Sequence, residues 1–181
     1  MNKFNDNFIN ISSNKSDKRF LDDYYSRYQR ILFDSRDDNS ILKFRDAIYE
    51  THQNKGKLIF IGNGASASLA SHAATDFTKQ AKISSIAFND HNLITALSND
   101  YGYRNWVAKA LEFYSGPNDM VIFISVSGES INLIEGIDFA KKRSLSTASL
   151  TGASKTNSLK KKSEYSLWVN SKAYNIVESI H

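Results

Sequence analysis

Short apolar runs alternate with longer amphipathic or polar stretches along most of this chain. The clearest runs are Leu58–Ile61 and Met120–Ser125, which are rich in strand-forming residues and lack the two-residue alternation of a half-exposed strand. Such runs are typical of strands that are covered on both faces of a parallel sheet. Three further strands are expected at Ile83–Phe88, Thr147–Leu150 and Tyr165–Val169.

The segments around these runs repeat their apolar residues every three or four positions, which predicts helices. Two helices are expected before the first strand, one from Asp17 onward and one from Ser40 to about His52. Later segments predict a short helical turn at Leu93–Leu97, a helix at Tyr103–Tyr114 and another after Ser130. The alternation predicts an α/β fold: a three-layer, doubly wound, five-stranded parallel sheet preceded by two N-terminal helices.

A length of 181 residues fits one domain. Residues 1–15 are rich in Asn, Ser and Lys and are expected to be flexible. Residues 17–55 form the helical N-terminal segment, and residues 57–181 form the α/β core. The first helix carries an aromatic stripe that predicts a subunit interface and a homo-oligomer: Phe20, Leu21, Tyr24, Tyr25, Tyr28, Ile31 and Leu32.

Composition and charge exclude several classes of function for this chain. Apolar residues make up 41% of the chain, which is enough for a buried core, and the net charge of +4 is mild. The lysines at 160–162 fit a solvated helix end better than a nucleic-acid patch. The chain has no cysteine, which excludes disulfides and thiolate chemistry, and no apolar run has membrane-spanning length. We therefore expect a cytoplasmic protein without nucleic-acid or membrane partners.

Two predicted strands end in turns that are rich in glycine and serine. Gly62, Asn63 and Gly64 follow the first strand, and Ser66 stands where a helix N-cap is expected. Ser125, Ser127 and Ser130 follow the Met120 strand, also just before a helix. Ligands of such sheets bind beyond the carboxyl ends of the strands, and hydroxyls with helix amides can hold a phosphomonoester.

An ordinary serine-capped turn explains either turn alone, but two in one sheet favour a phosphorylated ligand. Neither turn has the lysine of the nucleotide phosphate loop or the third glycine of the dinucleotide fingerprint, so no nucleotide cofactor is indicated.

Four motifs together resemble the phosphoheptose isomerases of the sugar isomerase (SIS) domain superfamily, from about Asp17 to His181. They are GNGAS-x5-H-x3-D at 62–76, SNDYG at 98–102, ISVSGES at 124–130 and SLTG at 149–152. The resemblance implies a homotetramer with sites at subunit interfaces. It also implies isomerisation of sedoheptulose 7-phosphate to D-glycero-D-manno-heptose 7-phosphate, for bacterial surface heptose in lipopolysaccharide or capsule.

The resemblance also assigns site residues. His72 falls on a zinc-binding histidine, Asp76 on a glutamate that binds the metal and acts as the base, and Glu178 on a glutamine that touches metal and substrate. It thus implies Zn²⁺ at these three residues, with Asp76 and Glu178 catalytic. His72 and Asp76 are one helical turn apart and can reach one ion. The implied substrate contacts are Asn63, Gly64, Ser66, Asn99, Asp100, Ser125, Ser127, Ser130 and Glu178.

The chain also departs from the family pattern. Asp76 is one methylene shorter than the glutamate, Val126 replaces a threonine and Asn175 replaces an aspartate. The family's last zinc-binding histidine lies eight residues after the glutamine, past His181. Either the final helix is cut in the given sequence, or the protein lacks that histidine and His181 is an untested substitute. Three hypotheses follow: an active isomerase, a non-catalytic phosphosugar-binding SIS protein, or a protein-binding scaffold. The intact serines favour the second over the third.

Overall fold

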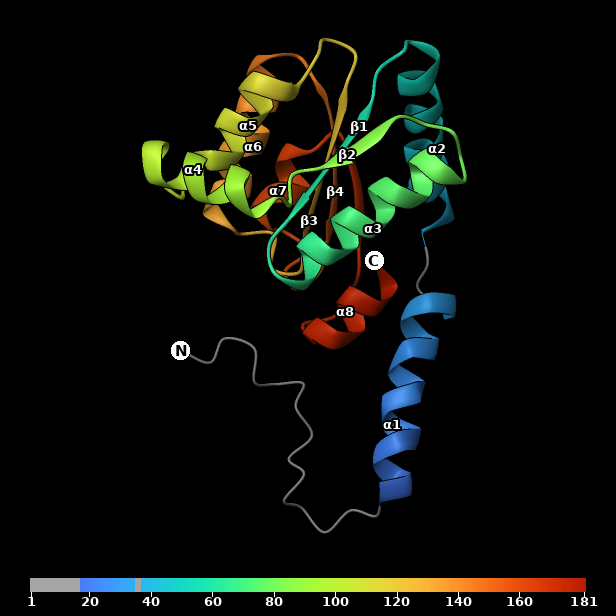
Figure 1. Ribbon diagram of the computed structural model, residues 1–181. Helices are drawn as coiled ribbons and strands as arrows, with labels where there is room; N and C mark the ends of the chain where they lie inside the picture. The colour runs from blue at the N-terminus through green and yellow to red at the C-terminus, as the bar shows by residue number, and fades with distance from the viewer. Residues whose placement is uncertain (1–16, 35–36) are drawn as a thin grey trace.

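The computed structural model describes residues 17–34 and 37–181, and the flexible segment expected at residues 1–15 lies outside them. Its centre is a five-stranded parallel sheet in the order β2-β1-β3-β4-β5 (Figure 1). The predicted fold class is confirmed. The strands are β1 (Leu58–Gly62), β2 (Ser85–Ala87), β3 (Met120–Ser125), β4 (Ser146–Thr151) and β5 (Tyr165–Trp168).

The central strands β1 and β3 are buried along their whole length, as their continuous apolar sequence predicts. They pair in register from Leu58 opposite Met120 to Gly62 opposite Ile124. The carboxyl ends of the two strands are therefore level, which brings the two polar turns to the same edge of the sheet.

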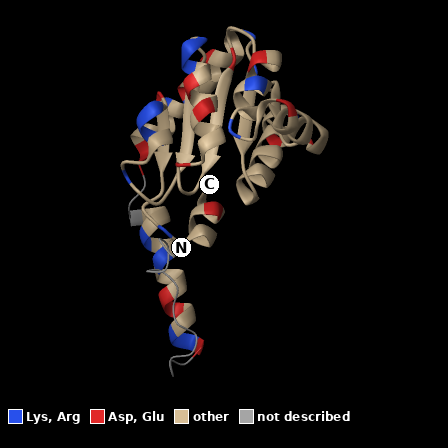
Figure 2. Cartoon of the chain, turned by 90° about the vertical axis from the view of Figure 1, so that its left-hand side faces the viewer, with Lys and Arg blue, Asp and Glu red and all other residues tan. Residues whose placement is uncertain are grey.

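Helices cover both faces of this sheet. Ala47 and Ile48 of α2 and Ala70 of α3 pack with one set of strand residues, whereas Trp106 of α5 and Leu133 of α6 pack with the other. Charged residues lie on the helices and loops, and the strands carry none (Figure 2). The helices are α2 (Asp38–Gln53), α3 (Ala65–Lys79), α4 (His91–Tyr101), α5 (Trp106–Tyr114), α6 (Ile131–Lys142), α7 (Ser158–Lys162) and α8 (Tyr174–Ile180).

The first helix, α1 (Asp17–Gln29), continues into a π-helical turn, η2 (Arg30–Asp34), and projects from the body (Figure 1). No residue of α1 is buried, and Tyr25 is 64% exposed. The Tyr28 hydroxyl donates to Ser179 Oγ at 3.2 Å, and Asn175 Nδ2 donates to the Tyr24 hydroxyl at 3.1 Å. These bonds join α1 to α8, and Leu21, Tyr25 and Leu32 of the predicted stripe remain exposed.

Three local expectations were wrong. The helical turn at Leu93–Leu97 is part of the longer α4, which Asp90 caps by accepting from the Leu93 amide. The helix expected from Tyr103 begins at Trp106, because Gly102, at φ 80°, ends α4 and Tyr103 lies in the turn that follows. Gly64, and not Ser66, is the N-cap of α3, and Ser66 is a buried residue of its first turn.

Within residues 17–34 and 37–181, no helix combines the length and the apolar character that crossing a membrane requires.

Candidate active site at the carboxyl edge of the sheet

The order of the strands creates a switch point between β1 and β3. The chain leaves β1 for β2 on one side and returns to β3 on the other side, so the loops after β1 and β3 diverge. Open α/β sheets bind ligands at such a point, beyond the carboxyl ends. This edge is the lower one in Figure 1, where α8 also lies.

The loop after β3 gathers the three predicted serines, and we call it the serine turn (residues 125–130). Ser125 Oγ lies 3.5 Å from Ser127 Oγ and 3.5 Å from Ser130 Oγ. The Gly128 amide donates to Ser125 Oγ at 3.1 Å and so fixes that hydroxyl. Ser130 is the N-cap of α6 but makes no side-chain cap bond, which leaves its hydroxyl available to a ligand.

Contacts with the chain before α7 hold the serine turn in shape. Gly128 has φ 66°, and a Cβ atom there would lie 2.1 Å from Asn157 Oδ1. Asn157 is buried, and its side chain donates to Thr151 Oγ1 at 3.1 Å and accepts from the Lys160 amide at 2.9 Å. Sequence reasoning missed Asn157, although an asparagine just before a short helix is a cap signal.

Glu129 places a carboxylate beside the hydroxyls of the serine turn. Its two oxygens accept from the Ser158 amide at 2.8 Å and the Ser158 hydroxyl at 2.6 Å. The negative charge is therefore bound at the start of α7, which reduces its repulsion of an anion at the serines.

The loop after β1 is joined to the serine turn through Asn63. The side-chain amides of Asn63 and Asn132 bond each other twice, at 3.0 Å both times. The Tyr103 hydroxyl donates to Asn63 Oδ1 at 3.2 Å. Asn132 and Tyr103 were missed because they lie 69 and 40 residues away from Asn63 in the chain.

Gly64, Ser66, Asn99 and Asp100 complete the predicted contacts. Gly64 caps α3 and Ser66 lies in its first turn, and a Cβ on Gly62 would lie 2.5 Å from the Ser66 backbone. Asn99 and Asp100 are exposed at the end of α4, and Asn99 Nδ2 donates to Asp100 Oδ1 at 3.0 Å. The nearby Tyr103 ties this end of the helix to Asn63.

His72 and Asp76 lie together on the outer face of α3. His72 Nε2 is 3.2 Å from Asp76 Oδ2, and the side chains are 78% and 51% exposed. Ser66 and Ala67, in the first turn of the same helix, are buried against the body. The exposed His72–Asp76 pair therefore faces away from the sheet. An imidazole nitrogen and a carboxylate oxygen are suitable zinc ligands.

Glu178 does not join this pair within one chain. In residues 17–34 and 37–181, no three His, Asp or Glu side chains come together in a way that could hold a metal. Glu178 is on α8, whose buried residues Ile176 and Val177 face the body. A single copy thus supplies two of the three ligands that the sequence suggested, and it does not fit a complete zinc site.

α8 also brings His181 against the end of β4. Val177 packs with Val126 and Val169, and the His181 amide donates to the Val177 carbonyl one turn back. Both ring nitrogens of His181 are buried and have no hydrogen-bond partner among the described residues. Burial lowers the pKa of His181 to about 4, against a smaller opposing effect of the Thr151 backbone.

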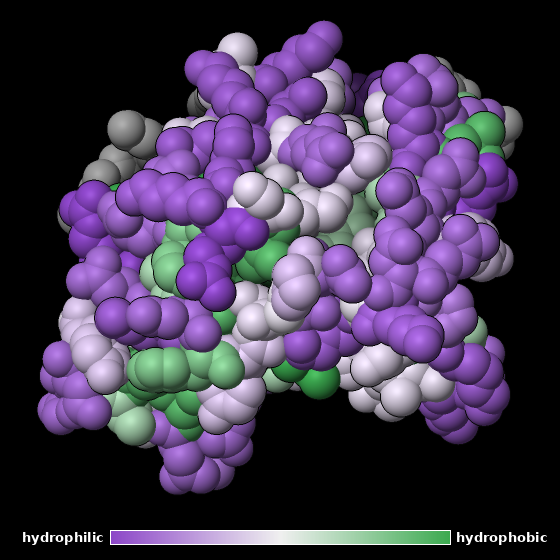
Figure 3. Space-filling view, turned by 90° about the horizontal axis from the view of Figure 1, so that it is seen from above, coloured by the Kyte–Doolittle hydropathy of each residue, from purple (hydrophilic) through white to green (hydrophobic). Residues whose placement is uncertain are grey.

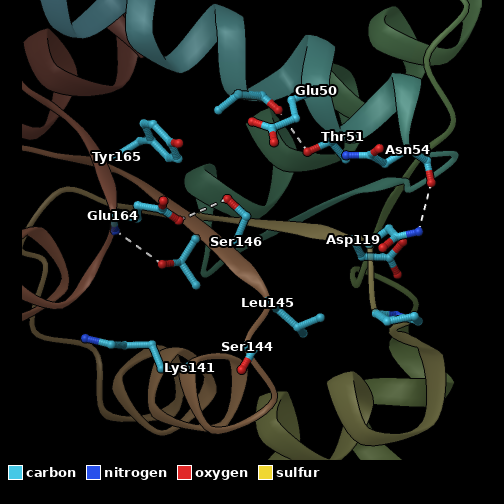
Figure 4. Close-up of a pocket in the computed structure, with 14 residues that line it drawn as sticks. Glu50, Thr51, Asn54, Asp119, Lys141, Ser144, Leu145, Ser146, Glu164 and Tyr165 are labelled. Carbon is cyan, nitrogen blue, oxygen red and sulfur yellow. Dashed lines mark hydrogen bonds between the residues drawn. The ribbon is translucent and has the colours of Figure 1, made fainter.

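A pocket of about 470 Å³ lies at the opposite, amino edge of the sheet. Figure 3 views this edge, and Figure 4 shows Glu50, Glu164 and Tyr165 around the pocket, with Glu164 accepting from Ser146 Oγ at 3.2 Å. Ser146 and Tyr165 begin β4 and β5. Since ligands of open α/β sheets bind at the carboxyl ends, the serine turn is the stronger candidate site.

Comparisons with known proteins identify the family of this chain. The family model described as SIS domain matches residues 23–152. A phosphoheptose isomerase of Helicobacter pylori is 41% identical over 57% of this chain and 57% of its own length. A protein of Thermoplasma volcanium named "Probable phosphoheptose isomerase" is 33% identical over 81% of this chain and 78% of its own.

Structural similarity covers more of the chain than sequence similarity does. The structure of a phosphoheptose isomerase from Francisella tularensis matches with a TM-score of 0.83 over 92% of this chain and 93% of that one, at 21% identity. The sequence match to the Helicobacter pylori relative spans little more than half of that relative. The comparisons therefore establish the fold and the family.

Proposed function

This chain belongs to the SIS domain family and, within it, to the phosphoheptose isomerases, and from that premise we propose that it is a phosphosugar aldose–ketose isomerase. The proposed reaction converts sedoheptulose 7-phosphate to D-glycero-D-manno-heptose 7-phosphate. The product would serve bacterial surface heptose biosynthesis, for lipopolysaccharide or capsule, and the proposal includes a cytoplasmic location.

The serine turn is the observation that carries this proposal. The hydroxyls of Ser127 and Ser130 each lie 3.5 Å from Ser125 Oγ, just before the 12-residue helix α6. Hydroxyls and helix amides can donate to the three oxygens of a phosphomonoester, and the helix dipole favours its charge. We therefore assign the phosphate of the sugar to Ser125, Ser127 and Ser130, with Ser66 and Asn63 toward the sugar chain.

The proposed chemistry needs a base. A proton leaves C1 of the ketose and returns at C2, while the O1 hydroxyl proton moves to O2. The reaction proceeds through an enediol intermediate, and no atom is gained or lost. Asp76 is the proposed base, since a positioned carboxylate can carry the proton between adjacent carbons. Glu178 is the second proposed catalytic carboxylate, near the sugar oxygens.

Assembly is part of the proposal because Asp76 is half exposed in a single chain. Water-filled sites weaken electrostatic stabilisation of a developing oxyanion, so a competent site must be covered. We propose a homotetramer in which a second copy covers α3 and brings its own Glu178 to His72 and Asp76. The open aromatic surface of α1, including Tyr25, supports such an assembly.

Zinc is proposed for the same three residues, two from one copy and Glu178 from another. When bound, zinc would polarise the oxygens of the sugar. The proton transfers described above are assigned to the carboxylates alone.

Calorimetric titration with sedoheptulose 7-phosphate and with sedoheptulose tests the phosphate assignment. We expect binding of the phosphorylated sugar only, and equal or absent binding of the two would reject the assignment. A coupled assay of heptose 7-phosphate formation then tests the reaction. Light scattering tests the assembly, and a monomeric mass at micromolar concentration would contradict it.

Metal content, measured by mass spectrometry, tests the zinc proposal, with His72→Ala as the variant and the remote His52→Ala as its control. We expect zinc in the native protein and in the control, and little in the variant. The exposed His72–Asp76 pair specifically favours one alternative, a non-catalytic phosphosugar-binding protein. Phosphosugar binding without turnover in a metal-free protein would support that alternative.

A further inference from the structure

The side-chain amide of Asn63 has almost all of its hydrogen-bonding capacity filled. Its Oδ1 accepts from Asn132 Nδ2 at 3.0 Å and from the Tyr103 hydroxyl at 3.2 Å. Its Nδ2 donates to Asn132 Oδ1 at 3.0 Å. An amide oxygen has two lone pairs and an amide nitrogen has two hydrogens. Both acceptor positions are therefore used, and one N–H remains for a ligand.

The position of this amide joins the two halves of the candidate site. Asn63 follows β1 between two glycines, and Asn132 is in the first turn of α6, two residues after Ser130 of the serine turn. Asn132 is 1% exposed, so its side chain cannot turn freely. Tyr103, which is 54% exposed, closes the set from the loop after α4.

We propose that Asn132 and Tyr103 are positioning residues that hold the Asn63 amide as a hydrogen-bond donor to the carbonyl oxygen of an open-chain phosphosugar. This inference rests on the proposed function and names the substrate group that Asn63 recognises. A carbonyl oxygen, and the enediolate oxygen that replaces it, can only accept. A fixed N–H suits both, and it needs no reorganisation as negative charge develops. An amide free to turn would present its own oxygen part of the time and repel that charge.

The Tyr103→Phe variant tests this inference with little risk to folding, because the ring is half exposed and only a hydroxyl is lost. It frees one lone pair of Asn63 Oδ1. We expect calorimetry to show about threefold to tenfold weaker binding of sedoheptulose 7-phosphate, and unchanged binding of inorganic phosphate. Tyr101→Phe is the matched control in the same region, since its ring contact with Lys109 is kept, and it should change neither affinity.

A double-mutant cycle separates positioning from a direct or merely structural role. Once Asn63→Ala has removed the amide, Tyr103→Phe should cause no further loss of phosphosugar affinity. Additive losses in the double variant would overturn the inference, as would equal losses for phosphosugar and inorganic phosphate.

Asn132→Asp provides a second measurement. A carboxylate accepts but cannot donate to Asn63 Oδ1, so the reciprocal pair is lost with little change in shape. We expect at least tenfold weaker phosphosugar binding, with thermal unfolding as the check on folding. These experiments measure binding and do not depend on turnover. A protein that binds the phosphosugar without turnover would contradict the proposed reaction alone, whereas additive losses of affinity would contradict the positioning role alone. A native protein that binds no sugar phosphate would reject both.

Discussion

The serine turn and the His72–Asp76 pair are both parts of the candidate site, yet they are built in opposite ways. Ser125 is buried, its hydroxyl is fixed by the Gly128 amide, and the turn rests on the buried Asn157. His72 and Asp76 contact each other across one turn of α3, and both side chains are more than half exposed.

The difference shows which part of the function one chain can perform. The proposed phosphate site is preorganised, since the hydroxyls of the serine turn and the Gly128 amide are already positioned in the absence of a ligand. The His72–Asp76 pair lies open to water, and Glu178 lies on a different element, α8. We infer that a single copy can bind a phosphosugar, whereas the proposed catalysis depends on what covers α3.

The largest expected effect separates the two regions by chemistry. Asp76→Asn removes the proposed base but leaves the serine turn intact, so kcat should fall by about 10²–10⁴-fold. The dissociation constant of the phosphosugar should change by less than about twofold, because Asp76 lies on α3, whereas the phosphate is assigned to the serines that follow β3. The coupled assay and calorimetry measure the two quantities.

Asp46→Asn, on the exposed face of α2, is the control for that prediction and should leave both quantities unchanged. A kcat within tenfold of the native value in Asp76→Asn would show that another group is the base.

Gly128→Ala should damage the preorganised region and spare the exposed one. The new Cβ would overlap Asn157 Oδ1 and would occupy a backbone with φ 66°. We expect the free energy of unfolding to fall by about 2–4 kcal/mol, with loss of phosphosugar binding. Urea denaturation measures the first effect and calorimetry the second.

Gly102→Ala is the matched control, because Gly102 has φ 80° but nothing within 4 Å of a Cβ. It should show only the backbone cost, about 1–3 kcal/mol, and should keep phosphosugar binding. Equal losses in the two variants would mean that contact with Asn157 does not shape the serine turn.

The buried His181 extends the comparison to pH. The pKa of His181 is lowered by burial from 6.5 to about 4, so the ring is neutral in both folded and unfolded states above pH 6.5. As the pH falls from 6.5 to 4, the unfolded chain binds a proton that the folded chain does not. The free energy of unfolding should therefore fall over this window, by up to roughly 3 kcal/mol.

Urea denaturation at several pH values measures this slope. His181→Gln should flatten it, because glutamine has no proton to gain in this pH range. Parallel pH profiles for the native protein and His181→Gln would contradict the assignment.

The sequence predicted the sheet because its central strands are buried on both faces and so read as unbroken apolar runs, as in Met120–Ser125. It predicted the serine turn because glycine and serine at a strand end have direct local causes. It could not predict the partners of Asn63, since Asn132 comes from 69 residues away. It also misplaced the cap at Ser66, because Gly64, at φ 58°, takes the cap position without any side-chain bond.

The smallest effect concerns Val126, which the sequence marked as a departure within the phosphate turn. Its side chain is 3% exposed and packs with Val169 and Val177, on the α8 side of the turn. Val126→Thr should therefore bring a hydroxyl into an apolar cluster and lower the free energy of unfolding by about 1–2 kcal/mol. It should leave the dissociation constant of the phosphosugar within about twofold, because the side chain at 126 packs with Val169 and Val177. Urea denaturation and calorimetry measure the two quantities. The control variant is Val126→Ala, which loses packing without adding a hydroxyl. A Val126→Thr variant that binds the phosphosugar tenfold more tightly would show that position 126 reaches the phosphate after all.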